Sequence, residues 1–373
     1  MAAAEAARRR HERNSPTERR HHPAPKRRRR DDWFSRFNRF LGAVIAIAAV
    51  ALLLVLGFIV ETARPGPNPA EDAVVVIPRG ASVTSIGRIL ETEGFIRNAL
   101  VFRAATMVYA RGRSLQAGEY EIAERASQRQ IIEQMANGRS VMHSITIAEG
   151  LTSAMAVAIL AQSDVLTGDI PPVPPEGAIL PETYHVERGM DRTALLRRMM
   201  ADRDRVLREV WAGRARDLPI RTPQEAVILA SIVEKETGVA AERPRVAAVF
   251  TNRLRRGMQL ESDPTIIYGV CRQHPERCVN GRLVNERTGR QRGIRQSEID
   301  MHTGYNTYRI PRLPPTPIAN PGRAALEAVV NPPHTNDLFF VADGTGGHVF
   351  AETNAQHEAN VRRWRQIEAA GQQ

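Results

Sequence analysis

The feature that most restricts the fold is an uninterrupted apolar run near the start of the chain. Residues 41–60 are twenty residues without a charged side chain. At 1.5 Å per residue, a helix of this length spans about 30 Å, the thickness of one bilayer hydrocarbon core. The run is longer than the apolar part of a signal peptide, and no Ala-x-Ala cleavage site follows it. The pattern therefore predicts an uncleaved transmembrane helix over residues 41–60, with a cleaved signal peptide as the alternative.

The segment ahead of this run is strongly basic. Residues 1–40 hold 13 Arg or Lys against 5 Asp or Glu, so they carry +8 of the chain's formal +11 and leave +3 for the rest. Positive charge beside a membrane span stays on the cytoplasmic side. We interpret residues 1–40 as a disordered cytoplasmic tail, with the remainder of the chain outside. Anionic lipid explains the charge better than nucleic acid, because no recognisable nucleic-acid module follows.

The chain beyond the span is long enough for two domains. Residues 61–73 contain Pro65, Pro67 and Pro69 and are expected to form a stiff spacer that lifts the next domain off the bilayer. About 300 residues follow, enough for two domains with cores of their own. We place the boundary between residues 74–145 and residues 146–373.

The first of these domains has a short alternating pattern of strands and helices. Ser82 begins one helix, and Ser127 with Gln130 forms a capping box for another. The elements expected, in order, are a strand at 74–77, a helix ending at Gly94, a helix at about 99–111, a strand at 118–122 and a helix ending near Gly138. The pattern predicts a small α/β unit.

The most informative stretch of the larger domain is residues 223–238. Thr222 and Glu225 match a T-x-x-E capping box, with Pro223 at the first helical position. Gly238 stands where a helix commonly ends in the left-handed conformation. Almost no polar face lies between these ends, so the pattern predicts a buried helix.

Two carboxylates fall in the last turn of that helix. Glu236 continues its apolar stripe, so burial and the negative end of the helix dipole both raise the carboxyl pKa. A glutamic acid in such a place stays protonated near neutral pH and can act as a general acid. The alternative is an ion pair at the helix end, made by Glu236 or Glu234. Arg243 and Arg245 are the candidate partners.

Other segments of this domain have the composition of a sugar-binding groove. Residues 176–184 alternate polar groups, a proline and Tyr184, and tyrosine rings stack on sugar faces. Residues 313–322 form a proline-dense loop. A helix is expected over residues 242–255, and residues 261–265 are expected to begin a loop. We interpret residues 176–184 as the wall of a groove that binds a polysaccharide and the proline-dense loop as a rigid support for the same chain.

Over residues 74–365 the chain resembles the endolytic murein transglycosylase family, the YceG-like proteins. The matching segments are Glu149-Gly150, Glu176-Gly177, Pro181-Glu182-Thr183, 231–237, Asn252-Arg253-Leu254, Asp263-Pro264-Thr265, 305–308, 313–322 and 340–350. The resemblance implies an α+β fold: a single N-terminal transmembrane helix, a small LysM-like α/β subdomain over 74–145 and a larger mixed α+β catalytic domain. The small unit could equally be a packing domain without sugar affinity.

The resemblance also implies an activity. Family members cut peptidoglycan glycan strands internally and leave 1,6-anhydro-N-acetylmuramic acid ends. Their catalytic glutamate, the second of an E-K-E-T motif, falls on Glu236, and no cofactor or metal is implied. The implied location is the bacterial inner membrane with a periplasmic catalytic domain, and the implied partners are wall synthases and the elongation or division machinery.

Several polar residues are candidates for contacts with the glycan, although each could equally serve a turn or a cap. They are Asp263, Thr265, Gln259, Asn306, Tyr308, Pro315, Glu149, Glu176 and Tyr184. Asp263, Glu261 and Glu149 could also supply a second carboxylate, as a lysozyme-like hydrolase requires. A non-enzymatic, membrane-tethered protein that binds the cell wall is the third alternative.

An arginine-rich insertion over residues 271–292 departs from the family pattern. It holds Cys271 and Cys278, the only cysteines in the chain. On the oxidising side of the membrane these two cysteines are expected to form a disulfide. A metal site with His274 is the alternative, but the spacing does not match zinc motifs. Thr316 also stands where the proline-rich family motif often has glycine.

Overall fold

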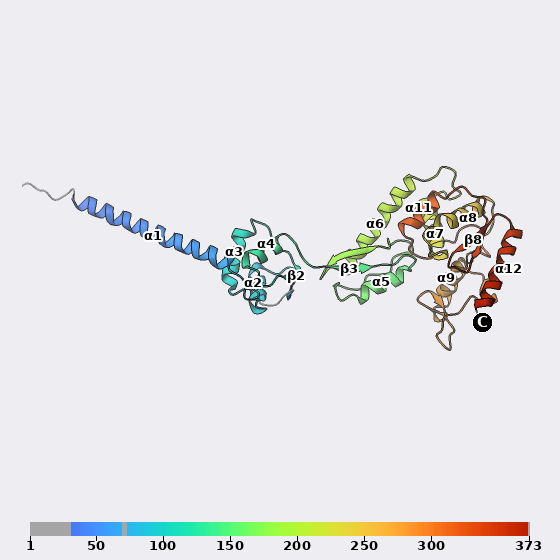
Figure 1. Ribbon diagram of the computed structural model, residues 1–373, viewed down its shortest axis with the longest axis horizontal. Helices are drawn as coiled ribbons and strands as arrows, with labels where there is room; N and C mark the ends of the chain where they lie inside the picture. The colour runs from blue at the N-terminus through green and yellow to red at the C-terminus, as the bar shows by residue number, and fades with distance from the viewer. Residues whose placement is uncertain (1–30, 69–72, 372–373) are drawn as a thin grey trace, which may run out of the picture.

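The computed structural model describes residues 31–68 and 73–371. Most of the predicted tail, residues 1–30, and residues 69–72 of the predicted linker lie outside the described residues. Helix α1 (Asp31–Ala63), a small lobe and a large lobe follow one another along the long axis of the molecule (Figure 1). The small lobe is residues 73–136 and the large lobe residues 142–371.

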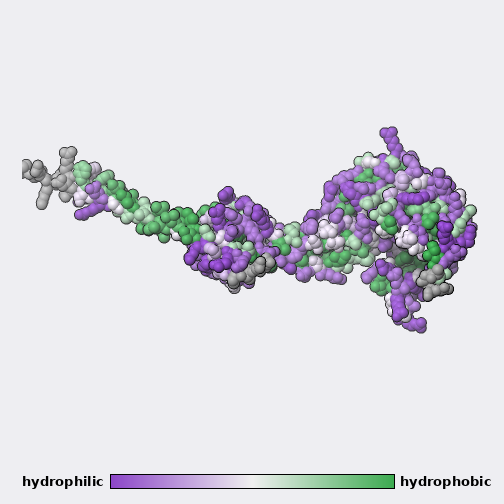
Figure 2. Space-filling view, viewed as in Figure 1, coloured by the Kyte–Doolittle hydropathy of each residue, from purple (hydrophilic) through white to green (hydrophobic). Residues whose placement is uncertain are grey.

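Residues 41–57 of helix α1 are apolar on every side and are not covered by other parts of the protein. Trp33–Ala63 is long and apolar enough to cross a membrane, and the side chains of residues 41–57 are exposed, Leu53 at 67% and Leu54 at 69%. Figure 2 shows the same helix as a hydrophobic rod attached to a largely hydrophilic body. Such a helix needs an apolar environment. It is consistent with a single-pass anchor, and the α+β fold class with one long apolar N-terminal helix is confirmed.

The small lobe has the predicted element order. Its elements are β1 (Ala73–Ile77), α2 (Val83–Thr92), α3 (Ala99–Tyr109), β2 (Gly118–Ile122) and α4 (Gln128–Ala136). Strands β1 and β2 pair antiparallel, with Val75 opposite Tyr120. The predicted capping box at Ser127 and Gln130 is present at the start of α4. The likeness of this lobe to LysM modules stays a prediction.

The described part of the linker is not a free spacer. The hydroxyl groups of Thr62 and Tyr109 lie 3.0 Å apart, which ties the end of α1 to α3. The Gly66 N–H donates to the carbonyl oxygen of Arg125 at 2.8 Å. A Cβ added at Gly66 would lie 2.4 Å from the carbonyl oxygen of Ala126, so this close approach requires glycine. Residues 61–68 therefore pack on the small lobe, and the role of residues 61–73 as a spacer above the bilayer stays a prediction.

The large lobe is mainly helical around short two-stranded sheets (Figure 1). Its helices are α5 (Ser153–Gln162), α6 (Arg192–Ala212), α7 (Pro223–Glu236), α8 (Arg243–Arg255), α9 (Asp263–Gln273), α10 (Gln296–Ile299), α11 (Arg323–Val330) and α12 (Asn354–Gly371), with the 3-10 turn η1 (Pro275–Arg277). Its antiparallel strand pairs are β3 (Met142–Thr146) with β4 (Thr183–Glu187), β5 (Cys278–Val279) with β6 (Arg282–Leu283), and β7 (Phe339–Ala342) with β8 (His348–Ala351).

Helix α7 lies at the centre of this lobe. Every residue from Ala226 to Glu234 is buried, as the apolar pattern predicts. Helices α6, α8, α9 and α11 pack against it. At its start the Thr222 hydroxyl accepts from the N–H of Glu225 at 3.1 Å. The Glu225 carboxylate accepts from Arg221 N–H at 2.5 Å, so only half of the predicted capping box forms around Thr222.

Two local predictions around α7 are wrong. Gly238 does not adopt the left-handed conformation, because α7 ends at Glu236 and the next residue, Thr237, is already extended with φ −135°. The Thr237 hydroxyl accepts from the N–H of Val239 at 3.0 Å. Asp263 does not begin a loop but the helix α9. Ser262 precedes that helix and Pro264 lies in its first turn, a typical helix start that the loop interpretation overlooked.

Candidate active site

The two glutamates at the end of α7 have different surroundings. Glu234 forms the ion pair expected at the helix end, with its Oε1 3.0 Å from Nη2 of Arg243. Its other oxygen accepts from the N–H of Gly322 at 2.9 Å. Arg243 also binds Glu149 at 3.1 Å, whereas Arg245 binds Asp337 at 2.7 Å. Glu234 is therefore a fully partnered structural group, and this leaves Glu236 as the carboxylate without a cationic partner in direct contact.

Glu236 opens into a small polar cavity of about 230 Å³. The cavity is built from residues far apart in the sequence, on α7, α8, α9, α12, strand β7 and the loops before α9 and after α10. Its lining residues are Glu236, Arg253, Leu260, Glu261, Asp263, Tyr308, Phe339, Phe340 and His357.

A serine holds the Glu236 carboxyl group in place. The Ser262 hydroxyl donates a hydrogen bond to Oε1 of Glu236. Ser262 is itself fixed, because its N–H donates to the Thr307 hydroxyl at 2.9 Å and its carbonyl accepts from the Thr265 hydroxyl at 2.6 Å. Glu236 thus has one defined orientation in the cavity.

The surroundings of Glu236 raise its pKa to about 7. Burial is the largest cause, and the negative charge of Asp263 acts in the same direction. The hydrogen bond from Ser262 and the charge of Arg253 oppose the shift without cancelling it. A carboxyl group with this pKa exists in both protonation states near neutral pH and can give and take a proton.

Tyr308 and Asp263 form a second polar pair in the same cavity. The Tyr308 hydroxyl donates to Oδ1 of Asp263 at 2.8 Å. Burial raises the pKa of Tyr308, and the nearby charge of Asp263 raises it further. The phenol therefore keeps its proton at neutral pH and donates the hydrogen bond. The pair brings together two residues that the sequence proposes as glycan contacts.

Arg253 organises the floor of the cavity. Its guanidinium donates to the carbonyl oxygen of Leu338 at 2.7 Å and of Gln259 at 3.0 Å, and it binds the Glu261 carboxylate at 2.7 Å. The same group lies 5.1 Å from the centre of the Phe339 ring. One buried cation therefore joins α8, the turn before α9 and strand β7, three segments that all line the cavity.

His357 of α12 closes one side of the cavity. Its ring stacks on Phe339, with 5.0 Å between ring centres. Burial lowers the pKa of His357, and the charge of Arg253 lowers it further, so the imidazole is neutral at pH 7. Its Nδ1 is buried and has no hydrogen-bond partner among the described residues.

The other candidate contact residues do not line the Glu236 cavity. Buried positions hold Thr265, Asn306 and Tyr184, whose polar groups bond within the protein. Glu149 binds Arg243, and Glu176 accepts from the N–H of Ser153 at 2.8 Å. The side chains of Gln259 and Pro315 are exposed outside the cavity. The structure thus groups Asp263, Tyr308 and Glu261 with Glu236 and gives most of the others a supporting place.

Sequence reasoning missed several residues that line or support the cavity. They are Ser262, Arg253, Phe339, Phe340 and His357. Ser262 directly precedes the Asp-Pro-Thr motif, and Arg253 lies in the Asn-Arg-Leu motif, so both motifs carried a usable signal. The remaining residues come from the C-terminal segment, and only the tertiary fold brings them to Glu236.

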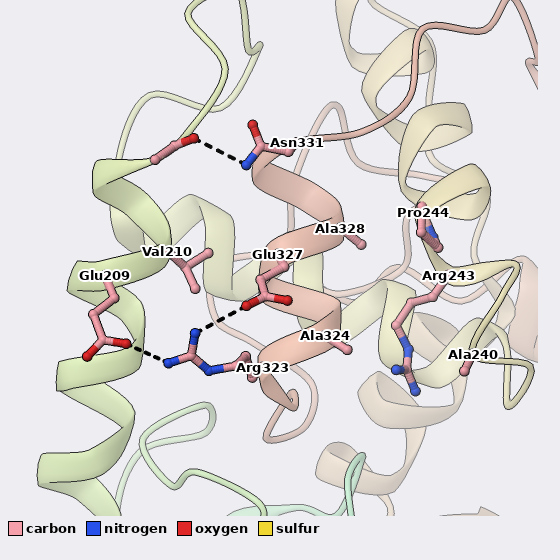
Figure 3. A pocket seen from close by; sticks show the side chains of 11 residues that line it. Glu209, Val210, Ala240, Arg243, Pro244, Arg323, Ala324, Glu327, Ala328 and Asn331 are labelled. Atoms are coloured by element: carbon pink, nitrogen blue, oxygen red, sulfur yellow. Dashed lines mark hydrogen bonds and ion pairs between the residues drawn. The ribbon is translucent and has the colours of Figure 1, made fainter.

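A larger cavity of about 620 Å³ lies elsewhere on the large lobe, between α6, α11 and the start of α8 (Figure 3). Arg323 binds Glu209 at 2.5 Å and Glu327 at 3.2 Å across its rim. Arg243 lines this cavity, but none of its lining residues belongs to the Glu236 cavity. Because Glu236 lines only the smaller cavity, we take the smaller cavity as the candidate active site.

The large lobe is a mixed α+β unit whose central buried helix ends in a glutamate that faces a polar cavity. The chain belongs to the YceG-like family, whose model matches residues 75–363. It is 27% identical over 338 residues to an endolytic murein transglycosylase of Streptococcus pneumoniae D39, covering 79% of this chain and 58% of that protein. It therefore spans little more than half the length of that relative.

Two further proteins are similar over most of this chain. An endolytic murein transglycosylase of Bacillus subtilis 168 is 25% identical over 312 residues, covering 75% of this chain and 81% of the relative. The crystal structure of a YceG-like protein from Listeria monocytogenes covers 77% of this chain and 98% of its own, with 24% identity and a TM-score of 0.46.

Proposed function

We propose that this protein is a membrane-anchored endolytic lytic transglycosylase of peptidoglycan. It cleaves the bond between N-acetylmuramic acid and N-acetylglucosamine inside glycan strands and leaves 1,6-anhydro-N-acetylmuramic acid ends. The observation that carries the proposal is Glu236, a carboxyl group with a pKa of about 7 in a polar cavity. The family and the names of the curated relatives support the substrate.

One carboxyl group performs both proton transfers in this reaction. Protonated Glu236 donates to the glycosidic oxygen while the bond to muramic acid C1 breaks. The resulting carboxylate then accepts the proton of the C6 hydroxyl, whose oxygen forms the new bond to C1. Glu236 ends in its starting state, and no water is consumed. A pKa near the working pH suits both steps, because the two protonation states differ little in free energy.

The neighbours of Glu236 suit this sequence of steps. Ser262 orients the carboxyl group, and its hydrogen bond stabilises the charged intermediate state of Glu236. The Tyr308–Asp263 pair supplies polar atoms for sugar hydroxyl groups on the same side of the cavity. Arg253 keeps Glu261 bound, so this carboxylate is less free to act as a base.

A lysozyme-like hydrolase is the second candidate, because Asp263 lines the same cavity as Glu236. A hydrolase uses a second carboxylate as nucleophile or as the base that activates water. The products distinguish the two: a hydrolase leaves reducing ends. A wall-binding protein without activity would release no products.

The location proposed here follows from helix α1 and the basic tail, and the proposed partners follow from the family. Helix α1 anchors the chain in the bacterial inner membrane by a single span with residues 1–40 in the cytoplasm, and the lobes lie in the periplasm. Wall synthases and the elongation or division machinery are the proposed protein partners, and no nucleic acid is expected. The small lobe, predicted over residues 74–145, is proposed as a LysM-like glycan-binding subdomain, and the large lobe, predicted over residues 146–373, as the catalytic domain. Strand β3 belongs to the large lobe, because it pairs with β4.

The test is product release from purified sacculi by the detergent-solubilised full chain. Wild type is compared with Glu236→Gln and with Glu225→Gln, the same substitution at the other end of α7. We expect anhydro-ended products from wild type and from Glu225→Gln, and none from Glu236→Gln. Undiminished release by Glu236→Gln would contradict the proposed role of this residue.

A further inference from the structure

The basic insertion projects from the large lobe as a folded arm. It leaves the lobe next to α9 and extends away from it (Figure 1, orange). We call residues 271–292 the arginine arm. Neither the Glu236 cavity nor the steps of the proposed reaction use any residue of the arm.

The arm is held in a defined conformation. Cys271 and Cys278 form a disulfide at its base. Asn280 and Gly281, with φ of 50° and 70°, form the two-residue turn between β5 and β6, where both positions require the left-handed conformation. Leu283 is buried at 1% exposure in a small apolar cluster with residues of α9.

A buried ion pair fixes the C-terminal end of the arm, where the chain returns to the lobe. Arg292 binds Glu298 of α10 through both carboxylate oxygens, at 2.6 and 2.8 Å, and the Glu298 side chain is 1% exposed. A bidentate pair of this kind fixes orientation as well as distance. The arm is thus a structured surface rather than a loose loop.

The arm concentrates the positive charge of the outer part of the chain. It holds six arginines and two glutamates, a net charge of +4, whereas the whole chain beyond residue 40 carries only +3. Both glutamates lie within 4 Å of Arg277. Arg282, Arg287 and Arg290 are exposed and have no acidic partner among the described residues.

One of these charges, Arg282, lies near the end of α7. A Cβ added at Gly281 would meet the Met155 sulfur at 3.9 Å, so the hairpin turn lies against α5. A notch of about 460 Å³ separates the arm from α5, and Arg282 lines it. Partial burial lowers the pKa of Lys235, and the positive charge of Arg282 lowers it further. Arg282 of the arm is therefore close enough for its charge to influence Lys235, the residue next to Glu236.

We propose that the arginine arm binds carboxylate groups of the peptides attached to the glycan strand. This inference rests on the proposed function and names the part of the substrate that the arm recognises. Where a peptide is attached, the lactyl group of muramic acid is an amide and the sugars of the strand are uncharged. Exposed guanidinium groups therefore gain little from the sugars, whereas they bind the carboxylates of the peptides. An anionic membrane surface fits less well, because the arm and α1 lie at opposite ends of the molecule (Figure 1).

The test measures binding with cleavage switched off. Full-length protein carrying Glu236→Gln is bound to two soluble glycan ligands. One is strands with their peptides, and the other is naked strands, from which an amidase has removed the peptides and on which the freed lactyl carboxyl groups have been converted to amides. The arm variant combines Arg282→Gln, Arg287→Gln and Arg290→Gln. The matched control removes three exposed arginines from the opposite part of the large lobe, Arg197→Gln, Arg208→Gln and Arg216→Gln.

We expect the arm variant to bind peptide-bearing strands about tenfold more weakly at low salt, since each of the three exposed ion pairs contributes only a small share. The loss should shrink at high salt as the charges are screened. The control should bind as the parent does, and all three proteins should bind naked strands alike. Equal binding of peptide-bearing strands by arm variant and parent would overturn the proposal, as would an equal loss on naked strands.

Two more measurements distinguish this proposal from binding of the arm to a membrane and from the proposed cleavage activity. Binding to vesicles with anionic lipid should not differ between arm variant and parent, and a loss confined to the vesicles would assign the arm to the membrane instead. Cleavage of naked strands by the arm variant with Glu236 intact should equal wild type. If wild type cleaves nothing while the binding difference holds, the proposed activity fails and the arm's recognition of peptide carboxylates stands.

Discussion

The two faces of the last turn of α7 carry the same residue type in opposite environments. Burial raises the pKa of Glu234 as well, but Arg243 and the N–H of Gly322 contact its carboxylate directly and oppose that rise. Glu236 faces a cavity with a serine hydroxyl and no cation in contact, and its pKa rises to about 7. The comparison teaches that two glutamates in one helical turn differ by their partners: Glu234 is held in an ion pair, whereas Glu236, the proposed acid, faces the cavity.

The sharpest test of this comparison is to replace each glutamate in turn. We expect Glu236→Gln to lower the rate of glycan cleavage by at least about 10³-fold, because general acid–base catalysis contributes roughly 10²–10⁴-fold and here one group serves twice. The fold should stay intact by circular dichroism. A variant that retains a tenth of the wild-type rate would break the assignment of Glu236.

The second prediction concerns Glu234, on the other face of α7, and the free energy of unfolding. Glu234→Gln leaves the buried Arg243 with a weaker partner, and removing one member of a buried ion pair costs roughly 3–5 kcal/mol. Urea denaturation should show a loss near the lower end, because Glu149 still binds Arg243. An unchanged denaturation midpoint would show that the ion pair is not structural.

The third prediction concerns the Tyr308–Asp263 pair. Tyr308→Phe removes the hydroxyl that donates to Asp263, and we expect cleavage to fall by about 10- to 100-fold, from a lost hydrogen bond to a charged group worth about 1.5–3 kcal/mol. Steady-state kinetics on soluble strands would measure it. Tyr305→Phe, whose hydroxyl bonds Thr316 outside the cavity, is the control and should lose much less.

The fourth prediction follows from the raised pKa of Glu236. A group with a folded pKa of about 7 and an unfolded pKa of 4.5 contributes stability that is full below pH 4.5 and is lost as pH rises through 7. Glu236→Gln should therefore be more stable than wild type at pH 9, by roughly 1–3 kcal/mol, and should lose that advantage at pH 4. Denaturation at the two pH values measures the difference, and equal midpoints at pH 9 would contradict the buried carboxyl.

The smallest expected effect is a shift of the pH profile. The Ser262 hydrogen bond opposes the rise in the Glu236 pKa, so Ser262→Ala should move the alkaline limb of the rate profile to higher pH. Thr265→Ser keeps a hydroxyl in the neighbouring network and should leave the limb in place. A shift of the Ser262→Ala limb to lower pH would reverse the sign assigned to this hydrogen bond.

Much of the fold follows from local patterns. The capping box at Ser127, the apolar course of α7 and the charge-free run in α1 each depend on residues close in sequence, and the structure has all three. The start of α9 differs from the loop expected over residues 261–265, because Asp263 begins the helix and Pro264 lies in its first turn, where proline is common.

The site was only partly predictable for a physical reason. The position of Glu236 on the apolar face of α7 can be read from helical spacing, and so can its separation from Glu234. The contacts of Arg253 with Leu338 and of His357 with Phe339 join segments far apart in sequence. No periodicity encodes such contacts, which is why residues that look equally suited to bind glycan, such as Tyr184, turn out to be buried supports.

The most direct test of the central claim is to run the cleavage in H₂¹⁸O and weigh the products. If Glu236 serves as acid and then base for an intramolecular attack, the new ends are 1,6-anhydro sugars, lighter than reducing ends by one water and free of ¹⁸O. Reducing ends that carry one ¹⁸O at C1 would contradict the claim, because water would then be the acceptor and a second carboxylate such as Asp263 would be required.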